Sequence, residues 1–339
     1  MRAWVITRHG NAADVLRLEE RPSPVPGNGQ ALIRCEGFGL NYADTMAVRG
    51  LYRDAPPPPC IPGYEVVGRI TDVGTGVDRA MIGGRVAAIT RFGGYAEEAV
   101  TDHRALMPVP EDLPLGIAAA LCTQGCTAWY MAMIARPLRP GDRVLVHSAA
   151  GGVGQFLVRI ALHQGCTVFG VTAGARKLAR LQAMGVHHPI DRLAGDPGAQ
   201  LAALLGRDRL DVSFNAVGGA TFRKDMELLG AGGAVVIFGG SERGTKRGPF
   251  GTLRFVWDMG VLIPALLMMK SRSVIGVNML RIGEQRPALL KRCMEEVLQA
   301  HTAGWFPDLA HHSFDATQLP AAIEQLTNGS SMGKLVVRW

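Results

Sequence analysis

The chain has 339 residues, enough for two domains that each bury a core of their own. Residues of the set AVILMFWYC make up 47% of the sequence and charged residues only 19%, which excludes a disordered or fibrous chain. Lys and Arg number 36 against 29 Asp and Glu, so the formal charge is +7. That charge suggests an anionic ligand but is too small to indicate nucleic-acid binding.

The cysteines and the N-terminus predict a cytoplasmic protein. The six cysteines are scattered without a CxxC pair, a pattern typical of reduced thiols. The first residues turn polar at once, so we expect no secretory signal. The most apolar run, residues 259–269, is broken by Pro264 and is shorter than the roughly 20 residues that span a bilayer. We expect it to form a buried or pocket-lining helix and no transmembrane segment.

Residue composition and hydrophobic patterning divide the chain into two regions. Residues 1 to about 120 are rich in Gly and Pro, with β-favouring runs that predict a partly open β region at 30–35, 65–73 and 85–90. From about residue 140, strands alternate with helices, which indicates βαβ units and a parallel sheet. The strands predicted there are 143–147, 167–171, 210–215, 234–238 and 274–277. Helices are predicted at 176–184 and 221–229, and after the first strand with Val153, Leu157, Ile160 and Ala161 as its apolar face.

A glycine-rich turn follows the first of these strands. Residues 149–154 read Ala-Ala-Gly-Gly-Val-Gly and match G-x-G-x-x-G with Ala149 in place of the first glycine. Gly151 would let the backbone approach a pyrophosphate, and Gly154 would let the helix pack closely on the strand. The sequence therefore predicts a dinucleotide site, with a tight turn that holds no ligand as the alternative.

The end of the second strand predicts which dinucleotide binds. An NAD site would carry Asp or Glu there, but residues 172–174 are Thr-Ala-Gly. Arg176, Lys177, Arg180 and Arg192 follow instead. We expect NADP(H) rather than NAD, because positive charge stands where a 2′-phosphate would lie. A solvated helix face is the alternative reading of these cations.

Several further motifs carry a family resemblance. They are 39–44 (GLNYAD), 49–52 (RGLY), 62–68 (PGYEVVG), 124–128 (QGCTA), the glycine turn and 333–336 (GKLV). With them the chain resembles the medium-chain dehydrogenase/reductase superfamily, in its zinc-independent quinone oxidoreductase branch. Residues 188–191 (HPID) and 276–279 (GVNM) are most similar to the vesicle amine transport protein group.

This resemblance implies an α/β fold in which a Rossmann domain, a doubly wound parallel sheet, is inserted in a GroES-like distorted β-barrel catalytic domain. The expected domains are 1–122 for the GroES-like domain, 123–265 for the NADP-binding domain, and 266–339 for a dimer strand and the return to the catalytic domain. The resemblance also implies an active-site cleft between the domains. It further implies a homodimer whose sheet continues through strands near residues 273–278.

The residues that bind zinc in the metal-dependent relatives are absent from this sequence. By local alignment their positions are Asn41, Tyr64 and Thr123, none of which supplies a thiolate or imidazole. The four closely spaced cysteines of a structural zinc lobe are also missing between residues 85 and 104. We therefore predict no zinc. Conjugated acceptors suit such a site, since a few hydrogen-bond donors stabilise an enolate or phenolate.

Three side chains are candidates for the chemistry. The resemblance implies that Asn41 and Thr127 lie beside the nicotinamide, and that Tyr52 occupies the place of the proton-donating tyrosine of enoyl thioester reductases. Each has a plainer alternative: Asn41 would support a turn, Tyr52 would line the pocket, and Thr127 would cap a helix.

The cofactor is expected to contact the glycine turn and the ends of later strands, where ligands bind in this architecture. The predicted residues are Ala150, Gly151, Gly152, Val153, Thr172, Lys177, Arg192, Asn215, Val217, Phe238, Gly239, Gly240 and Asn278. The basic stretch 242–247 is expected to be a solvated loop.

The sequence thus predicts a cytoplasmic NADPH-dependent oxidoreductase that reduces a small apolar quinone or α,β-unsaturated carbonyl. Two alternatives stay open: an enoyl thioester reductase, and a low-turnover NADPH-binding protein with a regulatory or membrane-associated role. The physiological substrate, and the choice between hydride and one-electron transfer, do not follow from the sequence.

Overall fold

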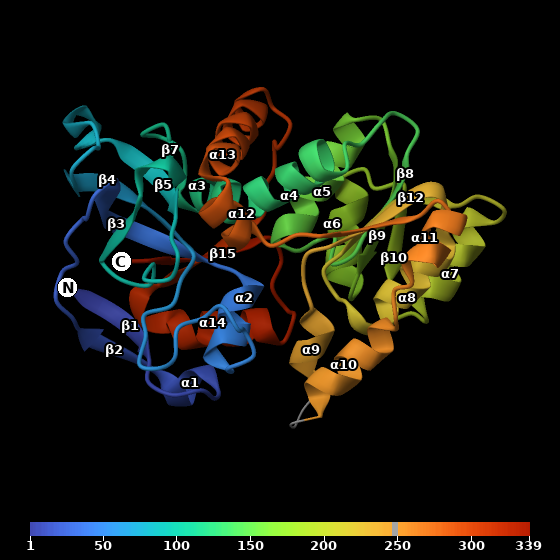
Figure 1. Cartoon of the computed structure of the whole chain (residues 1–339), viewed down its shortest axis with the longest axis horizontal. Helices are drawn as coiled ribbons and strands as arrows, with labels where there is room; N and C mark the ends of the chain where they lie inside the picture. Colours follow the sequence, from blue (N-terminus) through green and yellow to red (C-terminus); the bar gives the residue numbers. More distant parts are fainter. Residues whose placement is uncertain (246–249) are drawn as a thin grey trace. The chain divides into compact units, whose positions relative to one another are not determined.

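The computed structural model describes residues 1–245 and 250–339 and divides them into two units (Figure 1). The barrel unit comprises residues 1–126 and 279–339, and the Rossmann unit comprises residues 127–278. The second boundary falls later than the predicted 265/266. The reason is that β13 (Ser273–Gly276) pairs with β12 (Leu229–Ile237) and so completes the Rossmann sheet.

Six parallel strands form the Rossmann sheet. Besides β12 and β13 they are β8 (Arg143–Val146), β9 (Thr167–Thr172), β10 (His188–Asp191) and β11 (Leu210–Asn215). Their order is β10-β9-β8-β11-β12-β13, so the direction of winding reverses between β8 and β11. Ligands bind at that reversal in doubly wound sheets, at the carboxyl ends of the strands. The predicted Rossmann fold is confirmed, with strand boundaries within a few residues except for β12, which begins earlier.

Four helices connect β8 to β12 along the chain: α5 (Gly152–His163), α6 (Ala175–Ala183), α7 (Pro197–Leu205) and α8 (Gly219–Leu228). On α5 the predicted face is buried at Leu157, Ile160 and Ala161, whereas Val153 is half-buried. Phe156 is buried as well, so this helix is covered over more of its circumference than the pattern predicts. The sequence analysis did not predict α7, although Pro197 at its first position and Asp196, which accepts from the Ala199 N–H at 2.9 Å, mark its start.

The barrel unit is built on a sheet of order β14-β15-β3-β4-β5-β7, with β6 paired to β3. Its strands are β3 (Gln30–Leu40), β4 (Glu65–Val73), β5 (Arg85–Ile89), β6 (Glu98–Asp102), β7 (Leu106–Pro108), β14 (His311–Asp315) and β15 (Lys334–Arg338). A separate ribbon pairs β1 (Arg2–Ile6) with β2 (Leu16–Glu20). β3 runs on to Leu40, past the predicted end at residue 35. The prediction ended too early because glycines at 37 and 39 interrupt the β-favouring pattern of the sequence.

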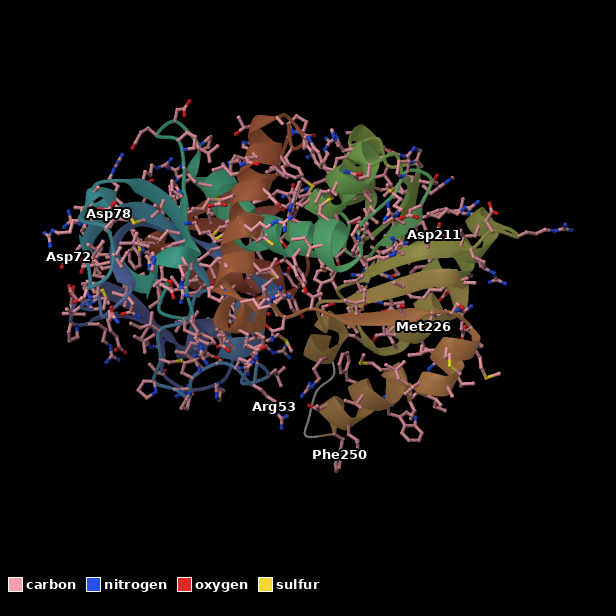
Figure 2. All side chains as sticks on the ribbon, turned by 45° about the horizontal axis from the view of Figure 1, so that its top comes forward. Arg53, Asp72, Asp78, Asp211, Met226 and Phe250 are labelled. Atoms are coloured by element: carbon pink, nitrogen blue, oxygen red, sulfur yellow. The ribbon has the colours of Figure 1, made fainter. Side chains whose placement is uncertain are left out.

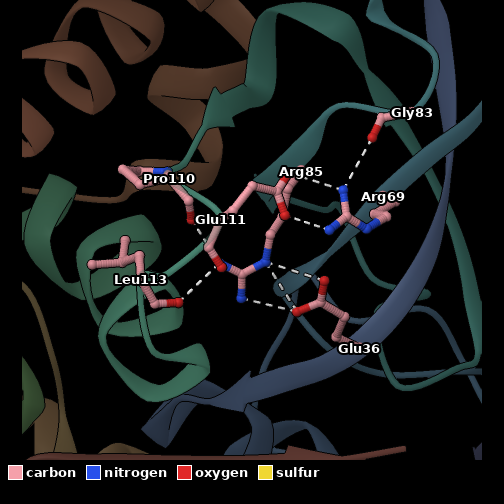
Figure 3. A network of polar contacts seen from close by, with 7 residues as sticks. All are labelled: Glu36, Arg69, Gly83, Arg85, Pro110, Glu111 and Leu113. Carbon is pink, nitrogen blue, oxygen red and sulfur yellow. Dashed lines mark hydrogen bonds and ion pairs between the residues drawn. The ribbon is translucent and has the colours of Figure 1, made fainter.

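A buried arginine holds the turn after β7 to β5 (Figure 3). Arg85 donates to the carboxylate of Glu36 at 2.9 Å and to the carbonyls of Pro110 and Leu113, each at 2.8 Å. Arg69, on the neighbouring strand β4, donates to Glu111 at 3.0 Å. These bonds pin residues 110–113, which lead into the helical segment Leu115–Ala135.

The remaining helices of the barrel unit include α1 (Ala12–Val15), α2 (Tyr42–Val48), α3 (Leu115–Ala119), α12 (Met279–Gln285), α13 (Pro287–Thr302) and α14 (Leu319–Thr327). The core beneath the sheet gathers Ile33, Phe38, Val66 and Leu335, all buried. Strands β15, β3 and β4 are thus fixed side by side, and their ends at one edge carry the polar residues described below.

The apolar run 259–269 was expected to be a buried or pocket-lining helix, and most of it is exposed rather than buried, although Met259 lines a cavity. It covers the end of α10 (Gly251–Met259) and α11 (Pro264–Met269), and its side chains are exposed, with Val261 at 88% and Met268 at 75%. Figure 2 shows Phe250, just before α10, directed away from the ribbon. Apolar patterning alone cannot separate a helix that faces a core from one that presents the same face to a partner.

Within residues 1–245 and 250–339, two helical segments are long and apolar enough to cross a membrane. Leu115–Ala135 lies 72% buried within the protein, as a core helix does, whereas in Gly251–Met269 only Gly251 is buried. The basic stretch 242–247 begins in the short helix α9 (Ser241–Thr245), and its residues 246 and 247 lie outside the described part of the chain.

Candidate functional site

The glycine turn of the Rossmann unit connects β8 to α5. The Gly151 N–H donates to the Ser148 carbonyl at 2.8 Å, and Gly151 is the N-cap of α5, without a side chain to cap the first turn. A Cβ on Gly154 would lie 2.3 Å from the Ser148 oxygen, so only glycine fits there. Ala150, Gly151, Gly152 and Val153 therefore present a helix N-terminus that is open to an anion.

Positive charge gathers beside the end of β9. Lys177 lies in the first turn of α6 and is half-buried. Its burial and the nearby Arg192 and Arg176 lower the pKa of the Lys177 ammonium. The Arg192 N–H donates to the carbonyl of Thr172, the last residue of β9, at 3.0 Å. Like charges held this close favour an anionic ligand between them.

The carboxylate of Asp191, at this edge of the sheet, accepts hydrogen bonds from backbone N–H groups. Asp191, at the end of β10, accepts the N–H groups of Gly174 at 3.0 Å and Leu193 at 2.9 Å through one oxygen. These bonds lower the pKa of Asp191, the Gly174 bond contributing most. Asp191 thus fixes the loops after β9 and β10.

A buried network shapes the turn after β11. The Asn215 side-chain oxygen accepts from the N–H groups of Val217 at 2.9 Å and Gly218 at 2.8 Å, while its Nδ2 donates to Asp225 at 2.6 Å. His147 contacts the same carboxylate at 2.9 Å. The amide of Asn215 is therefore engaged within the protein, and it fixes the backbone at Val217 and Gly218. Sequence reasoning did not single out His147 or Asp225 for this role, although His147 directly precedes the glycine turn.

A cavity of about 460 Å³ lies at the carboxyl ends of β12 and β13. Four predicted residues line it, Phe238, Gly239, Gly240 and Asn278, and the structure thus brings them together. Phe255 and Met259 of α10 form an apolar wall that the predicted site did not include, apart from the general expectation that residues 259–269 line a pocket.

In the barrel unit, three strands place polar residues at one edge. β3 runs antiparallel to both β15 and β4, so its last residues meet the first residues of those strands. Asn41 follows β3, Lys334 begins β15 and Glu65 begins β4. Side chains on paired antiparallel positions share a face of the sheet.

These three side chains are hydrogen-bonded together. Lys334 Nζ forms an ion pair with Glu65 Oε1 and donates to Asn41 Oδ1 at 3.2 Å. Asn41 Nδ2 donates to Glu65 Oε1 at 3.0 Å. Glu65 and Lys334 are both fully buried, whereas Asn41 is half-buried. The arrangement couples a buried ion pair to one amide that reaches the surface of the unit.

Asp44 lies beneath this cluster, on α2. Its carboxylate accepts the Asn41 backbone N–H at 2.7 Å. Burial is the largest influence and raises the pKa of Asp44 to about 7, although the bond from Asn41 opposes it. Asp44 therefore titrates near neutral pH.

Tyr52 lies against Tyr64, the residue before Glu65. Their rings meet edge to face, with centroids 6.0 Å apart. Burial, followed by the charge of Asp54, raises the pKa of Tyr52 above its ordinary value. Arg281 of α12 forms an ion pair with Asp54. The phenol of Tyr52 thus stays protonated at neutral pH, as a proton donor must.

The positions aligned with zinc ligands carry a different chemistry. Asn41 is engaged with Lys334 and Glu65, and the backbone N–H of Thr123 donates to the other Glu65 oxygen at 2.9 Å. A phenol, an amide and a hydroxyl make a poor donor set for zinc. No group of three or more His, Cys, Asp or Glu residues that could hold a metal occurs within residues 1–245 and 250–339. The predicted absence of zinc stays a prediction.

The predicted site residues thus divide between the units. Asn41 and Tyr52 belong to the barrel unit. Thr127 is a buried residue of the helical segment Leu115–Ala135 and, like every predicted cofactor residue, belongs to the Rossmann unit.

Comparison with known families matches most of the chain. Residues 27–136 match the model described as alcohol dehydrogenase GroES-like domain, and residues 152–296 match the model described as zinc-binding dehydrogenase. The synaptic vesicle membrane protein VAT-1 homolog of Rattus norvegicus is 31% identical over 342 residues, covering 99% of this chain and 84% of that one. A 2-haloacrylate reductase of a Burkholderia species is 29% identical over 83% of this chain and 85% of its own length.

Solved structures share the same architecture. The mycobacterial protein Rv1454c, complexed with NADPH, superposes with a TM-score of 0.86 at 26% identity and covers 100% of both chains. The quinone oxidoreductase of Pseudomonas syringae pv. Tomato DC3000 gives a TM-score of 0.87 at 24% identity over 100% of this chain and 99% of that one.

Proposed function

Because the chain belongs to the medium-chain dehydrogenase/reductase superfamily, in the quinone oxidoreductase branch near the VAT-1 homologs, we propose that it is an NADPH-dependent reductase of conjugated acceptors. Oxidoreductase relatives support an enzymatic role. The observation that carries the finer proposal has two parts. The Rossmann unit gathers cations beside the end of β9, and the candidate residues of the barrel unit are hydrogen-bond donors rather than metal ligands.

Several features support NADP(H) as the cofactor. The open N-terminus of α5 suits the pyrophosphate, and Lys177 with Arg192 suits a 2′-phosphate. Asp191 lies at the end of β10 and not of β9, where an NAD site would carry its acid. The NADPH bound in the Rv1454c structure agrees with this choice. When bound, the cofactor supplies a hydride.

The residues of the barrel unit support a quinone or an α,β-unsaturated carbonyl as the acceptor. Hydride addition to such a compound places negative charge on its oxygen, which N–H or O–H donors stabilise. Asn41 and Tyr52 are donors of that kind, and Tyr52 keeps its proton at neutral pH. The relative named 2-haloacrylate reductase points to the same class, because a haloacrylate is a conjugated carboxylate.

An assay of NADPH oxidation at 340 nm with quinones, alkenals and enoyl thioesters tests the proposal. We expect turnover with quinones or alkenals, and slower turnover with NADH. Turnover restricted to enoyl thioesters would assign the enoyl thioester alternative. Tight NADPH binding without turnover on any acceptor would contradict the proposal and favour the regulatory alternative.

We also propose that the protein is a homodimer in the cytoplasm. β13 is the edge strand of the Rossmann sheet, so one side of its backbone is open to pairing. The exposed apolar residues of α10 and α11 precede this strand, with Trp257 at 79% exposure. A second copy would cover both features. Sedimentation of the wild type as a dimer, and of Trp257→Glu as a monomer, would agree with this proposal, and a wild-type monomer would contradict it.

The exposed apolar helices α10 and α11 favour a second candidate function, attachment to a lipid surface. The VAT-1 relatives are named as synaptic vesicle membrane proteins. Co-sedimentation of the wild type with anionic vesicles, lost in Trp257→Glu, would support it. No pelleting with vesicles would restrict the helices to the dimer role.

A further inference from the structure

The ion pair of Lys334 and Glu65 stands out because both side chains are fully buried. Removing two charges from water is costly, and apolar residues of similar volume often replace such a pair without loss of stability. Stability alone is therefore a weak reason for this pair. Its contacts indicate what else it does.

Every polar atom of the pair is engaged. Lys334 Nζ has three donors, directed to Glu65, to Asn41 Oδ1 and to the Leu40 carbonyl at 3.1 Å. Glu65 Oε1 also accepts from Asn41 Nδ2, and its Oε2 accepts from the Thr123 N–H. The pair is neutral as a whole, so what it imposes on its surroundings is orientation.

Asn41 is the residue that this orientation acts on. An ammonium only donates and a carboxylate only accepts, so Lys334 must face the amide oxygen and Glu65 must face the amide nitrogen. Gln124 Nε2 also faces the amide oxygen, at 3.4 Å. The flipped amide would place two donors together and two acceptors together. Only one orientation of the Asn41 carboxamide is therefore allowed.

The allowed orientation leaves one donor for a ligand. Nδ2 carries two hydrogens, and Glu65 accepts one of them. Asn41 is half-buried while the ion pair beneath it is fully buried, so the amide is the part of the cluster that a ligand can reach.

We propose that the buried Lys334–Glu65 pair is a positioning device, which fixes the Asn41 carboxamide so that its second N–H is presented to the oxygen of the acceptor. This inference rests on the proposed reductase function and adds two positioning residues to it. Neither Lys334 nor Glu65 touches the reacting atoms; both act through Asn41.

Gly39 leaves the volume that the side chains of Lys334 and Glu65 occupy. A Cβ on Gly39 would lie 2.3 Å from Glu65 Oε1 and 2.4 Å from Lys334 Cε. Both neighbours are fully buried and cannot move into solvent. Gly39, two residues before Asn41 and on the same side of the strand, therefore leaves the volume that the two charged side chains fill.

The test compares four proteins: the wild type, Asn41→Ala, the apolar double variant Glu65→Leu/Lys334→Met, and the triple variant that combines them. We expect Asn41→Ala to lower kcat about 100- to 1,000-fold, the size of effect expected for one lost donor to a developing oxyanion. The double variant should lower kcat to a similar extent and leave the Kd for NADPH unchanged. The triple variant should be no slower than Asn41→Ala, because both changes remove the same function.

A readout that does not need turnover separates this proposal from the proposed function. In a ¹⁵N-labelled protein, the Asn41 side-chain NH₂ signals are identified by their loss in Asn41→Ala. The hydrogen donated to Glu65 should exchange slowly in the wild type and rapidly in the double variant. A wild type without turnover on any acceptor would overturn the proposed function, and the exchange rates would still decide the positioning role.

A folded double variant with wild-type kcat, or with slow exchange retained, would overturn the inference. If that variant does not fold, the pair Glu65→Met/Lys334→Met removes both polar ends with side chains of similar length, and the same outcomes apply to it. A triple variant much slower than Asn41→Ala would also overturn it, because the pair would then act on something besides Asn41.

Discussion

The two units place charge at the ends of strands in opposite ways. In the Rossmann unit, Lys177, Arg176 and Arg192 repel one another, and the first turn of α5 has no side-chain cap. In the barrel unit, Lys334 and Glu65 are paired, buried and fully hydrogen-bonded. The first arrangement concentrates positive charge at a strand end, whereas in the second the two charges are paired with each other.

This difference separates binding from stability. A change at the Rossmann edge should alter the affinity for the cofactor and leave the free protein as stable as before. A change in the barrel cluster should alter the free energy of unfolding and the turnover, with little effect on cofactor affinity. Each prediction below tests one side of that division.

The largest effect should come from breaking the buried pair. Lys334→Met leaves Glu65 buried without its cation, so the free energy of unfolding should fall by about 3–5 kcal/mol in urea denaturation. Lys291→Met, at an exposed residue of α13 whose ion pair with Glu295 spans 4.0 Å, should cost less than about 1 kcal/mol. Similar losses in the two variants would show that burial of the Lys334 pair has no special weight.

Overpacking the same cluster should come next. Gly39→Ala places a Cβ against Glu65 and Lys334, and should cost about 1–3 kcal/mol of unfolding free energy. Gly276→Ala is the matched control, because a Cβ there meets no atom within 4 Å. Equal stability of the two alanine variants would argue against a tightly filled space above Gly39.

At the Rossmann edge, Lys177→Glu should weaken NADPH binding about tenfold or more, since it replaces a charge-assisted contact with repulsion. Titration of NADPH fluorescence gives the Kd, and NADH serves as the second ligand, whose Kd should change less. Lys291→Glu reverses a charge in the barrel unit and should leave both values unchanged. Unaltered NADPH affinity in Lys177→Glu would place the 2′-phosphate elsewhere.

Tyr52→Phe should separate the two acceptor classes. We expect kcat with an enone to fall about tenfold or more, because an enolate needs a proton from a nearby acid. With a quinone the loss should be smaller, since a hydroquinone anion takes its proton from water. Equal losses with both acceptors would reduce Tyr52 to a residue that lines the pocket.

The last prediction concerns the dependence of stability on pH. Asp44 has a pKa of about 7 in the folded protein, raised by burial, and an ordinary low pKa in the unfolded chain. Between about pH 4 and pH 7 the folded state therefore binds more protons at Asp44, and stability falls as pH rises through this window. Above pH 7 the contribution no longer changes.

Urea denaturation at several pH values checks this window. The wild type should lose stability relative to Asp44→Asn by up to about 1.4 kcal/mol per pH unit between pH 4 and pH 7. Parallel pH profiles for the two proteins would mean that Asp44 is ionised throughout.

The sequence predicts most of the Rossmann unit because its signals are local. The glycine turn, the apolar strands and the helix after residue 151 each lie within a short window, and the structure agrees with them. The prediction that residues 259–269 form a buried or pocket-lining helix holds for Met259, which lines a cavity, but most of the run is exposed. A repeated apolar pattern does not say what covers it. The end of β3 was missed because glycines weaken the strand pattern where the chain needs space.

The barrel cluster shows the limit of sequence reasoning on the site. Asn41 was found through the family motif, and Glu65 and Lys334 stand inside two further motifs, but their pairing joins positions 269 residues apart. Nothing local marks such a contact. It follows only from the antiparallel pairing of β15, β3 and β4, which brings the three strand ends together.

The most direct test of the account follows one hydrogen atom. With NADPH deuterated at the reactive position of nicotinamide C4 and an alkenal acceptor, hydride transfer predicts one deuterium at the β-carbon of the saturated product by mass spectrometry, and a slower rate than with unlabelled NADPH. NADPH oxidation that leaves no deuterium in the product, or saturating NADPH binding without any oxidation, would contradict the account.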